Sequence, residues 1–341
     1  MKTTLLFCIL FLGSFQLLAA ERTWQLKTGF DYFNTTQNFD TEGNIDDLFT
    51  GQYFTHMRFN GDFIYRYNRY LNFIGSLEGA YGESFRGTDT RTNFNITNFA
   101  GGAEYILSLG KSSAVALGFI QNITPNAVDV NTDQVILSDG VMDSNLYFDL
   151  YTSIQRFGLR VKGGYHARDD GTANLGRFLG EIQYRYLPFI VGLGYEGIIS
   201  ATDDQFVNSP ISRTTVTDRV NGGSFKFYNV NPKLSEINLW GLYSQSPSLA
   251  FQVGLKHTIE GRSSAAGSTI YFNLFYSSKN NSYQTEFIRL ASHGKTEEGE
   301  FKINPTQYEE EQYFVPDPNK KKKRKKKRLK KRKKKRILDE V

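Results

Sequence analysis

The sequence predicts an all-β protein, an antiparallel transmembrane β-barrel of about 12 strands, or of 14, followed by a disordered basic C-terminal tail. Apolar and polar side chains alternate over segments of about 10 residues, and short and long connections alternate along the chain. Aromatic residues make up 15% of the chain although its mean hydropathy is −0.44. A membrane barrel shows all three features, because its outer wall faces lipid, its rims carry aromatic girdles and its turns are short at one end.

Residues 1–20 have the pattern of a secretory signal peptide. Lys2 supplies a positive start, residues 5–12 form a short apolar core, and Leu18-Ala19-Ala20 offers small residues for cleavage. The apolar core is shorter than the run of about 20 residues that a spanning helix needs. The one cysteine, Cys8, lies in this segment. The mature chain is therefore expected to contain no disulfide and no cysteine-ligated metal.

Strands are expected wherever side chains alternate with a period of two, since neighbouring side chains of a strand point to opposite faces. Phe189, Val191, Leu193 and Tyr195 alternate largely with glycine in this way. The twelve predicted strands are 23–33, 52–67, 70–82, 93–107, 113–123, 145–155, 158–168, 175–186, 189–199, 224–244, 249–260 and 268–277. The tenth is overlong, and a bulge is expected near Asn231-Pro232. A thirteenth strand at 282–291 and a fourteenth from 299–304 onward are the alternative.

The connections are expected to alternate in length, which a β-sandwich has no reason to show. Tight turns are predicted near 68–69, 108–110, 156–157, 187–188 and 246–248, and longer polar stretches at 34–51, 83–92, 124–144, 169–174, 200–222 and 261–267. Twelve and fourteen are both even numbers, so either count returns the chain to the side on which it begins. Both chain ends are therefore expected on the periplasmic side.

The formal net charge of +6 conceals an acidic body with a basic tail. Residues 320–336 contain 16 of the 41 Lys and Arg residues, and the 25 basic and 33 acidic residues before them give a charge of −8. Such a run repels itself and does not fold alone. Nucleic-acid binding is an alternative interpretation of the run, against which the signal segment argues. In the periplasm the tail would bind peptidoglycan carboxylates or anionic lipid headgroups, through residues that include Lys320, Lys321, Lys322, Lys323 and Arg324. A nonspecific soluble extension is the other interpretation.

The signal segment, the alternating strands and the sorted connections together resemble bacterial outer-membrane β-barrel proteins of the porin type. Residues 267–276 are similar to the terminal-strand signal that the barrel assembly machinery reads, with Phe272, Leu274 and Tyr276 at its alternating positions. The resemblance implies contact with outer-membrane lipid and a place in the cell outer membrane. The expected parts are the signal peptide at 1–20, the barrel at 21–291 or to about 305, and a linker and polybasic tail at 306–341.

Charged side chains at inward positions are the candidate solute-contacting residues. One wall is expected to be basic, and acids lie mostly elsewhere; the candidates are Arg160, Lys162, His166, Arg168, Arg177, Arg185, Glu181, Glu78 and Glu104. Such a lumen would orient dipolar solutes and favour anions at a constriction. Alternatively, ion pairs, with Glu181 amid the basic stripe, fill a narrow barrel.

Three functions follow from these alternatives. The first is a passive pore for small solutes with a mixed-charge lumen. The second is a plugged structural or adhesive surface barrel tethered to the cell wall by its tail. The third is a barrel hydrolase, for which only the histidines, above all His166 and His56, offer a base, and no nucleophile motif accompanies them. We expect no enzyme activity, no cofactor and no metal site.

Overall fold

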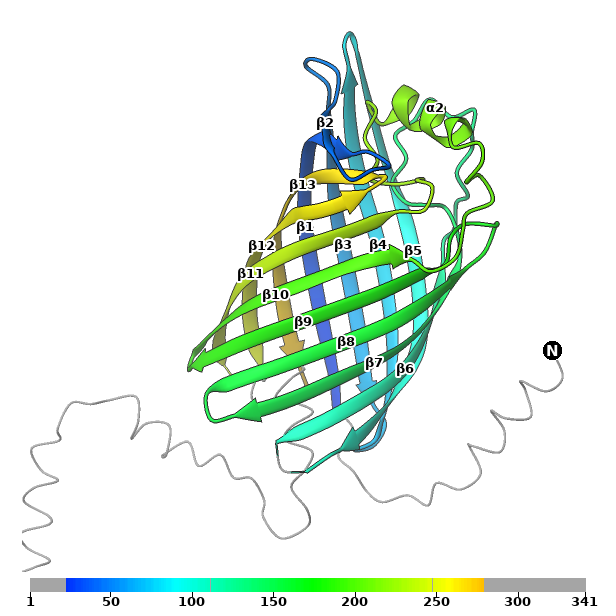
Figure 1. The fold of residues 1–341 in the computed structure, drawn as a ribbon. Helices are drawn as coiled ribbons and strands as arrows, with labels where there is room; N and C mark the ends of the chain where they lie inside the picture. Colours follow the sequence, from blue (N-terminus) through cyan, green and yellow to red (C-terminus); the bar gives the residue numbers. More distant parts are fainter. Residues whose placement is uncertain (1–22, 111, 247, 279–341) are drawn as a thin grey trace, which may run out of the picture. The chain divides into compact units, whose positions relative to one another are not determined.

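In the computed structural model, which describes residues 23–110, 112–246 and 248–278, the chain forms one closed antiparallel barrel (Figure 1). Twelve strands, β1 and β3 to β13, follow one another around the wall in sequence order, and β13 pairs with β1 to close it. Closure leaves no unpaired edge, which a chain that crosses lipid by strands cannot tolerate. The prediction of a twelve-stranded barrel is confirmed, and the residues of a thirteenth or fourteenth predicted strand lie outside the described part.

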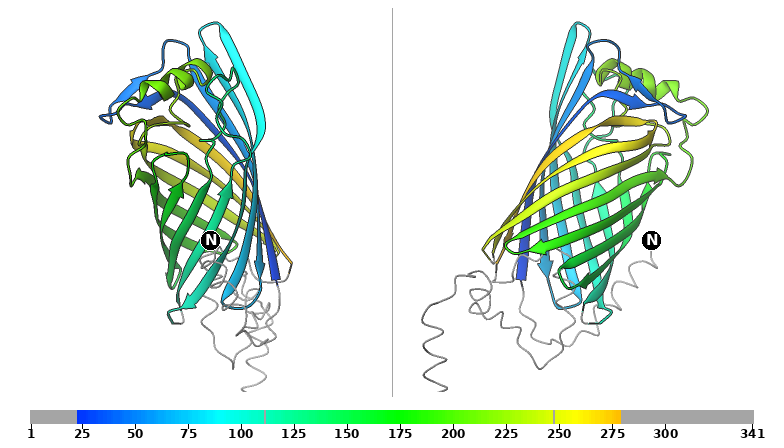
Figure 2. Two further views of the ribbon diagram at one scale, coloured as in Figure 1. Left: turned by 90° about the vertical axis from the view of Figure 1, so that its right-hand side faces the viewer. Right: turned by 60° about the vertical axis from the view of Figure 1, so that its left-hand side comes forward.

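Eight of the twelve wall strands are longer than predicted, chiefly at one end of the barrel, two match the prediction and two are shorter. Their bounds are β1 Thr23–Phe39, β3 Tyr53–Arg66, β4 Leu71–Arg86, β5 Asp89–Ser108, β6 Ser113–Ile123, β7 Asp143–Ile154, β8 Phe157–Arg168, β9 Leu175–Tyr186, β10 Phe189–Ser200, β11 Lys233–Ser246, β12 Leu249–Arg262 and β13 Ser264–Ser277. A short strand, β2 Ile45–Asp47, pairs with the end of β1 outside the barrel wall. The hairpin of β4 and β5 rises beyond the other strands in both views of Figure 2.

The predicted alternation places apolar side chains on the outer face. Leu193 is 55% exposed, Val253 57% and Phe148 45%, and none of them packs into a core. So much exposed apolar surface on regular strands is typical of a wall that faces lipid. The charged residues between them, such as Arg160 and Lys256, line the interior.

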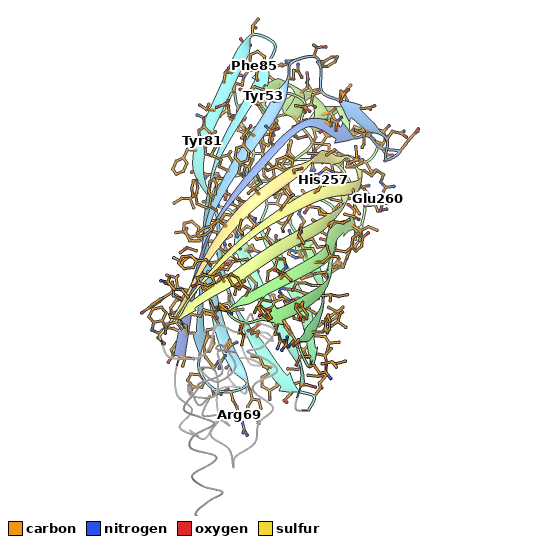
Figure 3. The ribbon with its side chains drawn as sticks, turned by 90° about the vertical axis from the view of Figure 1, so that its left-hand side faces the viewer. Tyr53, Arg69, Tyr81, Phe85, His257 and Glu260 are labelled. Atoms are coloured by element: carbon orange, nitrogen blue, oxygen red, sulfur yellow. The ribbon has the colours of Figure 1, made fainter. Side chains whose placement is uncertain are left out.

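Aromatic pairs gather at the end of the short turns. Trp24 lies 6.2 Å from Phe63 and 5.5 Å from Tyr276, measured between ring centroids. Phe157 with Tyr184 and Phe189 with Tyr243 add further outward pairs at this end, each at 5.2 Å. Figure 3 shows Arg69 at the same end, and Tyr53, Tyr81 and Phe85 at the opposite end. Rings at the level of the lipid headgroups form the girdle that membrane barrels carry.

All five predicted tight turns occur at that end of the barrel, between strands β3–β4, β5–β6, β7–β8, β9–β10 and β11–β12. At the other end, which we call the loop end, the connections differ in length. The long connections expected at 83–92 and 261–267 are wrong, because two residues join β4 to β5 and Ser263 alone joins β12 to β13. Residues 86–90 at the tip of the β4–β5 hairpin are exposed, so they are polar although they belong to strands and a tight turn. Residues 260–262 pair with β11 and residues 264–266 pair with β1, so the second stretch is also strand on both sides of Ser263.

Two segments at the loop end, residues 124–142 and 201–232, fold together, and we call them the plug. The second was partly mispredicted: β11 begins at Lys233, so 224–232 are plug and not the start of an overlong strand, and Pro232 precedes the strand. The plug carries α2 Ile211–Val220, the one helix of the described residues. Among these residues, no helix is long and apolar enough to cross a membrane.

Candidate functional site

The barrel interior holds a cavity of about 560 Å³ whose lining combines strand and plug residues. The strands contribute charged side chains from inward positions, and the plug contributes residues 137–139, 225–227 and 229. A volume of this size is within the range of small-molecule cavities, roughly 300–1,000 Å³. The cavity is therefore the candidate functional site.

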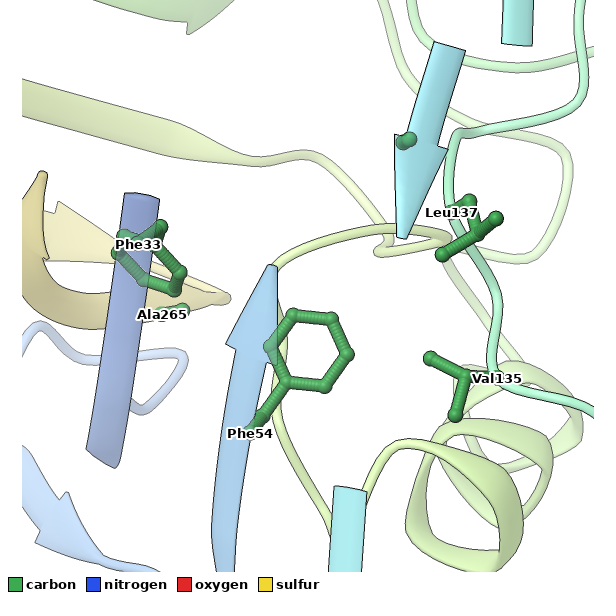
Figure 4. Close-up of a cluster of buried hydrophobic side chains, with 6 residues drawn as sticks. Phe33, Phe54, Val135, Leu137 and Ala265 are labelled. Carbon is green, nitrogen blue, oxygen red and sulfur yellow. The ribbon is translucent and has the colours of Figure 1, made fainter. Parts of the chain in front are cut away.

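The plug is held against the wall by an apolar cluster. Figure 4 shows Val135 and Leu137 of the plug beside Phe54, with Phe33 and Ala265 in the same cluster, and all five are at least 93% buried. Burial of each of the four larger side chains, Phe33, Phe54, Val135 and Leu137, contributes about 1.5–3 kcal/mol. The cluster fixes the plug at the mouth, over the charged cavity.

The second plug segment adds Phe227 to this contact. Its ring centroid lies 6.4 Å from that of Phe54 and 4.9 Å from that of His56, in edge-on arrangements. Phe227 also lines the cavity. The plug therefore contributes a ring both to the packed mouth and to the cavity roof.

Hydrogen bonds join the two plug segments into one unit. The Ile136 backbone N–H donates to Asn221 Oδ1 at 2.9 Å, and the Tyr228 N–H donates to Asp139 Oδ1 at 2.8 Å. Arg219 donates to the carbonyls of Val130 and Thr132, at 2.6 and 2.9 Å. Because each segment satisfies backbone groups of the other, we expect them to move together.

A buried ion pair organises the longer plug segment. Arg213 of α2 donates from Nη1 to Asp204 Oδ2 at 2.7 Å, and the two side chains are 5% and 1% exposed. The guanidinium lies over the rings of Phe206 and Tyr228, at 4.9 and 4.8 Å. It also donates to the Asn229 carbonyl, at 3.1 Å. This ion pair fixes α2 to the chain on both sides of it.

The six predicted basic residues of β8 and β9 occupy alternate positions on the inner face, and four of them line the cavity: Arg160, Lys162, His166 and Arg177. Arg160 donates to both carboxylate oxygens of Asp149, at 3.1 and 2.7 Å. Lys162 lies 4.0 Å from the same carboxylate. The acid of the neighbouring strand β7 thus offsets part of the basic wall.

The remaining members of the stripe differ in their surroundings. Arg168 pairs with Asp139 of the plug at 2.6 Å, so it contributes to holding the plug. His166 Nδ1 lies 3.2 Å from Asp143 Oδ1. Arg185 lies at the short-turn end of β9, away from the cavity.

The predicted acids are bound within the wall. Glu104 accepts hydrogen bonds from Asn72 at 2.6 Å and Tyr147 at 3.1 Å. Glu181 accepts from Gln183 and from the Trp240 indole, at 2.5 and 2.9 Å. Glu78 lines the cavity and accepts from Thr97 at 3.0 Å.

Arg58 and Lys256, two cations on other strands of the cavity wall, were not among the predicted site residues. Arg58 pairs with Asp31 and, at 3.5 Å, with Glu78. Lys256 pairs with Glu196 at 2.7 Å. The inward parity of Arg58 and Lys256 was readable from the alternation, but their pairing depends on the register between neighbouring strands.

Three charged side chains of the cavity have no bonded partner among the described residues. Arg177, Lys226 and Glu236 line it and make no hydrogen bond or ion pair with any residue that the structure describes. Arg177 is exposed to the cavity, whereas Lys226 and Glu236 are half-buried. Nothing in the sequence indicated Lys226, because residues 224–232 alternate like a strand although they form plug.

Aromatic rings of the inner wall lie flat over glycines of the next strand. A Cβ on Gly118 would come within 2.2 Å of the Tyr147 ring, and one on Gly254 within 2.2 Å of the Tyr271 ring. These glycines pair directly with the aromatic residues in the strand register. A ring that lies against the wall leaves the centre of the lumen free for solvent.

Of the three described histidines, His56 and His166 line the cavity and His257 does not. His56 contacts the plug, His166 faces Asp143, and His257 on the outer face approaches the Ser268 hydroxyl at 2.9 Å. Within the described part of the chain, no three His, Cys, Asp or Glu side chains are grouped to hold a metal ion. The expectation that the chain is not an enzyme stays a prediction.

The fold is similar to that of solved outer-membrane channels. An outer membrane channel from Pseudomonas putida F1 superimposes with a TM-score of 0.54 at 8% identity, covering 78% of this chain and 98% of the channel. The KdgM porin gives 0.41 at 9% identity over 73% of this chain and 98% of the porin, and the NanC porin 0.40 at 9% over 74% and 98%. No protein-family model and no curated protein matches the chain. The predicted resemblance to porin-like outer-membrane barrels is confirmed at the level of the fold.

The predicted signal peptide and the tail residues Lys320, Lys321, Lys322, Lys323 and Arg324 lie outside the described residues. The predicted roles of these segments therefore stay predictions.

Proposed function

We propose that the chain is a passive channel of the cell outer membrane, through which small hydrophilic solutes cross by way of the lumen. The observation that carries this proposal is the cavity of about 560 Å³, lined with charged side chains inside a closed wall. A barrel whose interior had only a structural role would not need ionised groups without partners in such a space. Contact with lipid does not account for these groups, because they line the interior.

In the proposed orientation, the short turns lie in the periplasm, together with the first and last residues of the barrel wall. The two ends meet there, since the Trp24 backbone N–H donates to the Ser278 hydroxyl at 3.1 Å. Short turns at the periplasmic end are the rule for bacterial outer-membrane barrels. Residues 279–341 would then continue into the periplasm, and the barrel assembly machinery would insert the chain.

Conductance of the purified full chain in a planar lipid bilayer tests the channel. A steady current that scales with salt concentration is the expected result. A silent bilayer across all voltages, with insertion verified by heat-dependent gel migration, would contradict the proposal.

The plug favours a second candidate, a structural or adhesive surface barrel. Its apolar cluster and its buried Arg213–Asp204 pair hold residues 124–142 and 201–232 at the mouth. A variant that lacks residues 203–230 distinguishes the two functions. If the intact chain is silent and only this variant conducts, the barrel is closed in its resting state and the second function is favoured.

The tail is proposed to tether the barrel to the cell wall. Sixteen basic residues within 320–336 would bind peptidoglycan carboxylates or anionic headgroups, each Lys or Arg near a charged membrane surface contributing about 1 kcal/mol. Deletion of 319–341 should weaken salt-sensitive co-sedimentation with purified cell wall, and equal co-sedimentation of the two chains would exclude the tether.

A further inference from the structure

Among the three charged groups of the cavity without a bonded partner in the described residues, Arg177 is the most exposed. It projects from the inner face of β9 into the cavity, is exposed there, and has no hydrogen bond or ion pair with any described residue. A guanidinium presents five N–H donors in a planar fork and keeps its charge at every working pH. All of these donors are available to a molecule in the cavity.

The two carboxylates that act on Arg177 are already bound elsewhere. Asp143 accepts from Asn122 at 2.5 Å and approaches His166 at 3.2 Å. Asp139 accepts from Arg168 at 2.6 Å and from the Tyr228 N–H at 2.8 Å. Neither carboxylate is placed to close the fork of Arg177.

A second cation reaches the same cavity from the plug. Lys226 lies 3.9 Å above the Phe33 ring and makes no ion pair with a described residue. Burial lowers the pKa of Lys226 from its ordinary value; Glu236 opposes this, while Arg58 and Lys256 act with burial. An anion in the cavity would reduce this cost of holding a buried ammonium.

The other cations of the cavity lie beside carboxylates. Arg58 pairs with Asp31 and Glu78, Arg160 and Lys162 lie at Asp149, and Lys256 pairs with Glu196. Glu236 partly offsets Lys226. Arg177 is therefore the exposed cation of the lining without a bonded carboxylate among the described residues.

We propose that the guanidinium of Arg177 is a binding site for small oxyanions, carboxylates or phosphates, within the lumen, in a cavity that Lys226 of the plug also lines. The fork of Arg177 matches two oxygens of such a group. The proposal rests on the channel function and deepens it, because a site of this kind makes the channel favour anions.

Two measurements on the full chain test the site. In a KCl gradient, Arg177→Gln should lower the preference for chloride over potassium about 30-fold. One unit charge at about 8 Å in a lumen of effective dielectric about 40 changes the occupancy of each ion about sixfold, in opposite directions for the two ions. Added inorganic phosphate should inhibit the KCl current of the unmodified chain and inhibit that of Arg177→Gln about tenfold less well. Arg177→Lys should keep the chloride preference but lose the phosphate inhibition, because an ammonium lacks the fork.

The matched control is Arg69→Gln, which removes the same charge outside the lumen, where Arg69 lies 4.6 Å above the Tyr70 ring at a short turn. It should behave as the unmodified chain. Equal selectivity and equal phosphate inhibition of the unmodified chain and Arg177→Gln would overturn the site and leave the channel standing. If the barrel is silent, calorimetric titration with phosphate decides: binding lost in Arg177→Gln supports the site, and equal or undetectable binding in both overturns it.

Discussion

The Arg213–Asp204 pair offers the most direct test of the plug, and Arg213→Ala is the perturbation. The variant leaves the Asp204 carboxylate, which is 1% exposed, without its cation. Removing one partner of a buried ion pair costs about 3–5 kcal/mol. Asp204 keeps the Phe206 N–H at 2.9 Å, so we expect the lower part of this range.

A local loss of about 3 kcal/mol raises the open population of the plug about 150-fold, since each 1.4 kcal/mol is a factor of ten. The barrel should stay folded, because its wall does not depend on α2 for any strand pairing. We therefore expect local opening of residues 201–232, a larger and noisier single-channel current, and faster proteolysis within this segment.

The Arg86–Asp218 pair supplies the control. Asp218 also belongs to α2, and the pair joins it to β4 at 2.6 Å, but its side chains are 41% and 38% exposed. Exposed pairs contribute about 0–1 kcal/mol, so Arg86→Ala should change neither current nor proteolysis appreciably. A double variant, Arg213→Met with Asp204→Leu, should recover much of the lost protection because no lone charge remains buried. If the proteolysis rate and the single-channel current of Arg213→Ala equal those of Arg86→Ala, the plug does not depend on the Arg213–Asp204 pair and the reasoning fails.

Three further results are expected. Gly254→Ala should destabilise the barrel by about 1–3 kcal/mol, because the new Cβ would lie 2.2 Å from the Tyr271 ring. Gly241→Ala is the control, since a Cβ there meets nothing within 4 Å. Heat-dependent gel migration compares the stability of the two variants. Leu193→Arg should lower the free energy of unfolding of the vesicle-inserted barrel by about 2–4 kcal/mol, and Ile154→Arg, at a turn, by about 0–1 kcal/mol. Denaturant titrations measure both losses, and equal losses would mean that Leu193 does not face lipid. The chain should not hydrolyse phospholipid esters, and ester cleavage that disappears in His166→Ala or His56→Ala would instead support the hydrolase alternative.

The sequence was sufficient to predict the barrel wall, because the polarity of a residue in a membrane barrel depends on the face of the strand that it occupies. Val191 and Leu193 had to be outward and Arg160 and Lys162 inward whatever the partner strands, so period two alone placed them. Connections were harder to predict. Polar residues near Thr88 and Ser263 are equally suited to loops and to strands, and only the strand pairing settles which occurs. β4 pairs with β5 as far as Arg86 and Asp89, whereas the ends of β12 and β13 on either side of Ser263 pair with β11 and β1.

The plug could not have been predicted from local pattern. Residues 224–230 alternate as a strand would, but Phe227 packs on Phe54 and Lys226 lies over Phe33, contacts that join segments about 170 residues or more apart. For the same reason the candidate site was only half predicted. The basic side of the lumen followed from parity, whereas the partners that neutralise Arg160 and Arg168, and the absence of one for Arg177 among the described residues, depend on register and on the folded plug.

Near the short-turn end, the inner wall is apolar on some strands and polar on others, and this difference affects the route that a solute would take through the proposed channel. Apolar clusters line it on β5–β7, around Ile106 and Tyr151, and on β10–β13, around Ile190 and Trp240. On β1 and β3 the inward groups are polar, and the Lys27–Asp62 pair at 3.3 Å keeps 34% and 29% of its side chains exposed to solvent. Hydrated ions avoid apolar constrictions. A solute that leaves the charged cavity would therefore follow the β1–β3 side of the lumen, where water already reaches the wall.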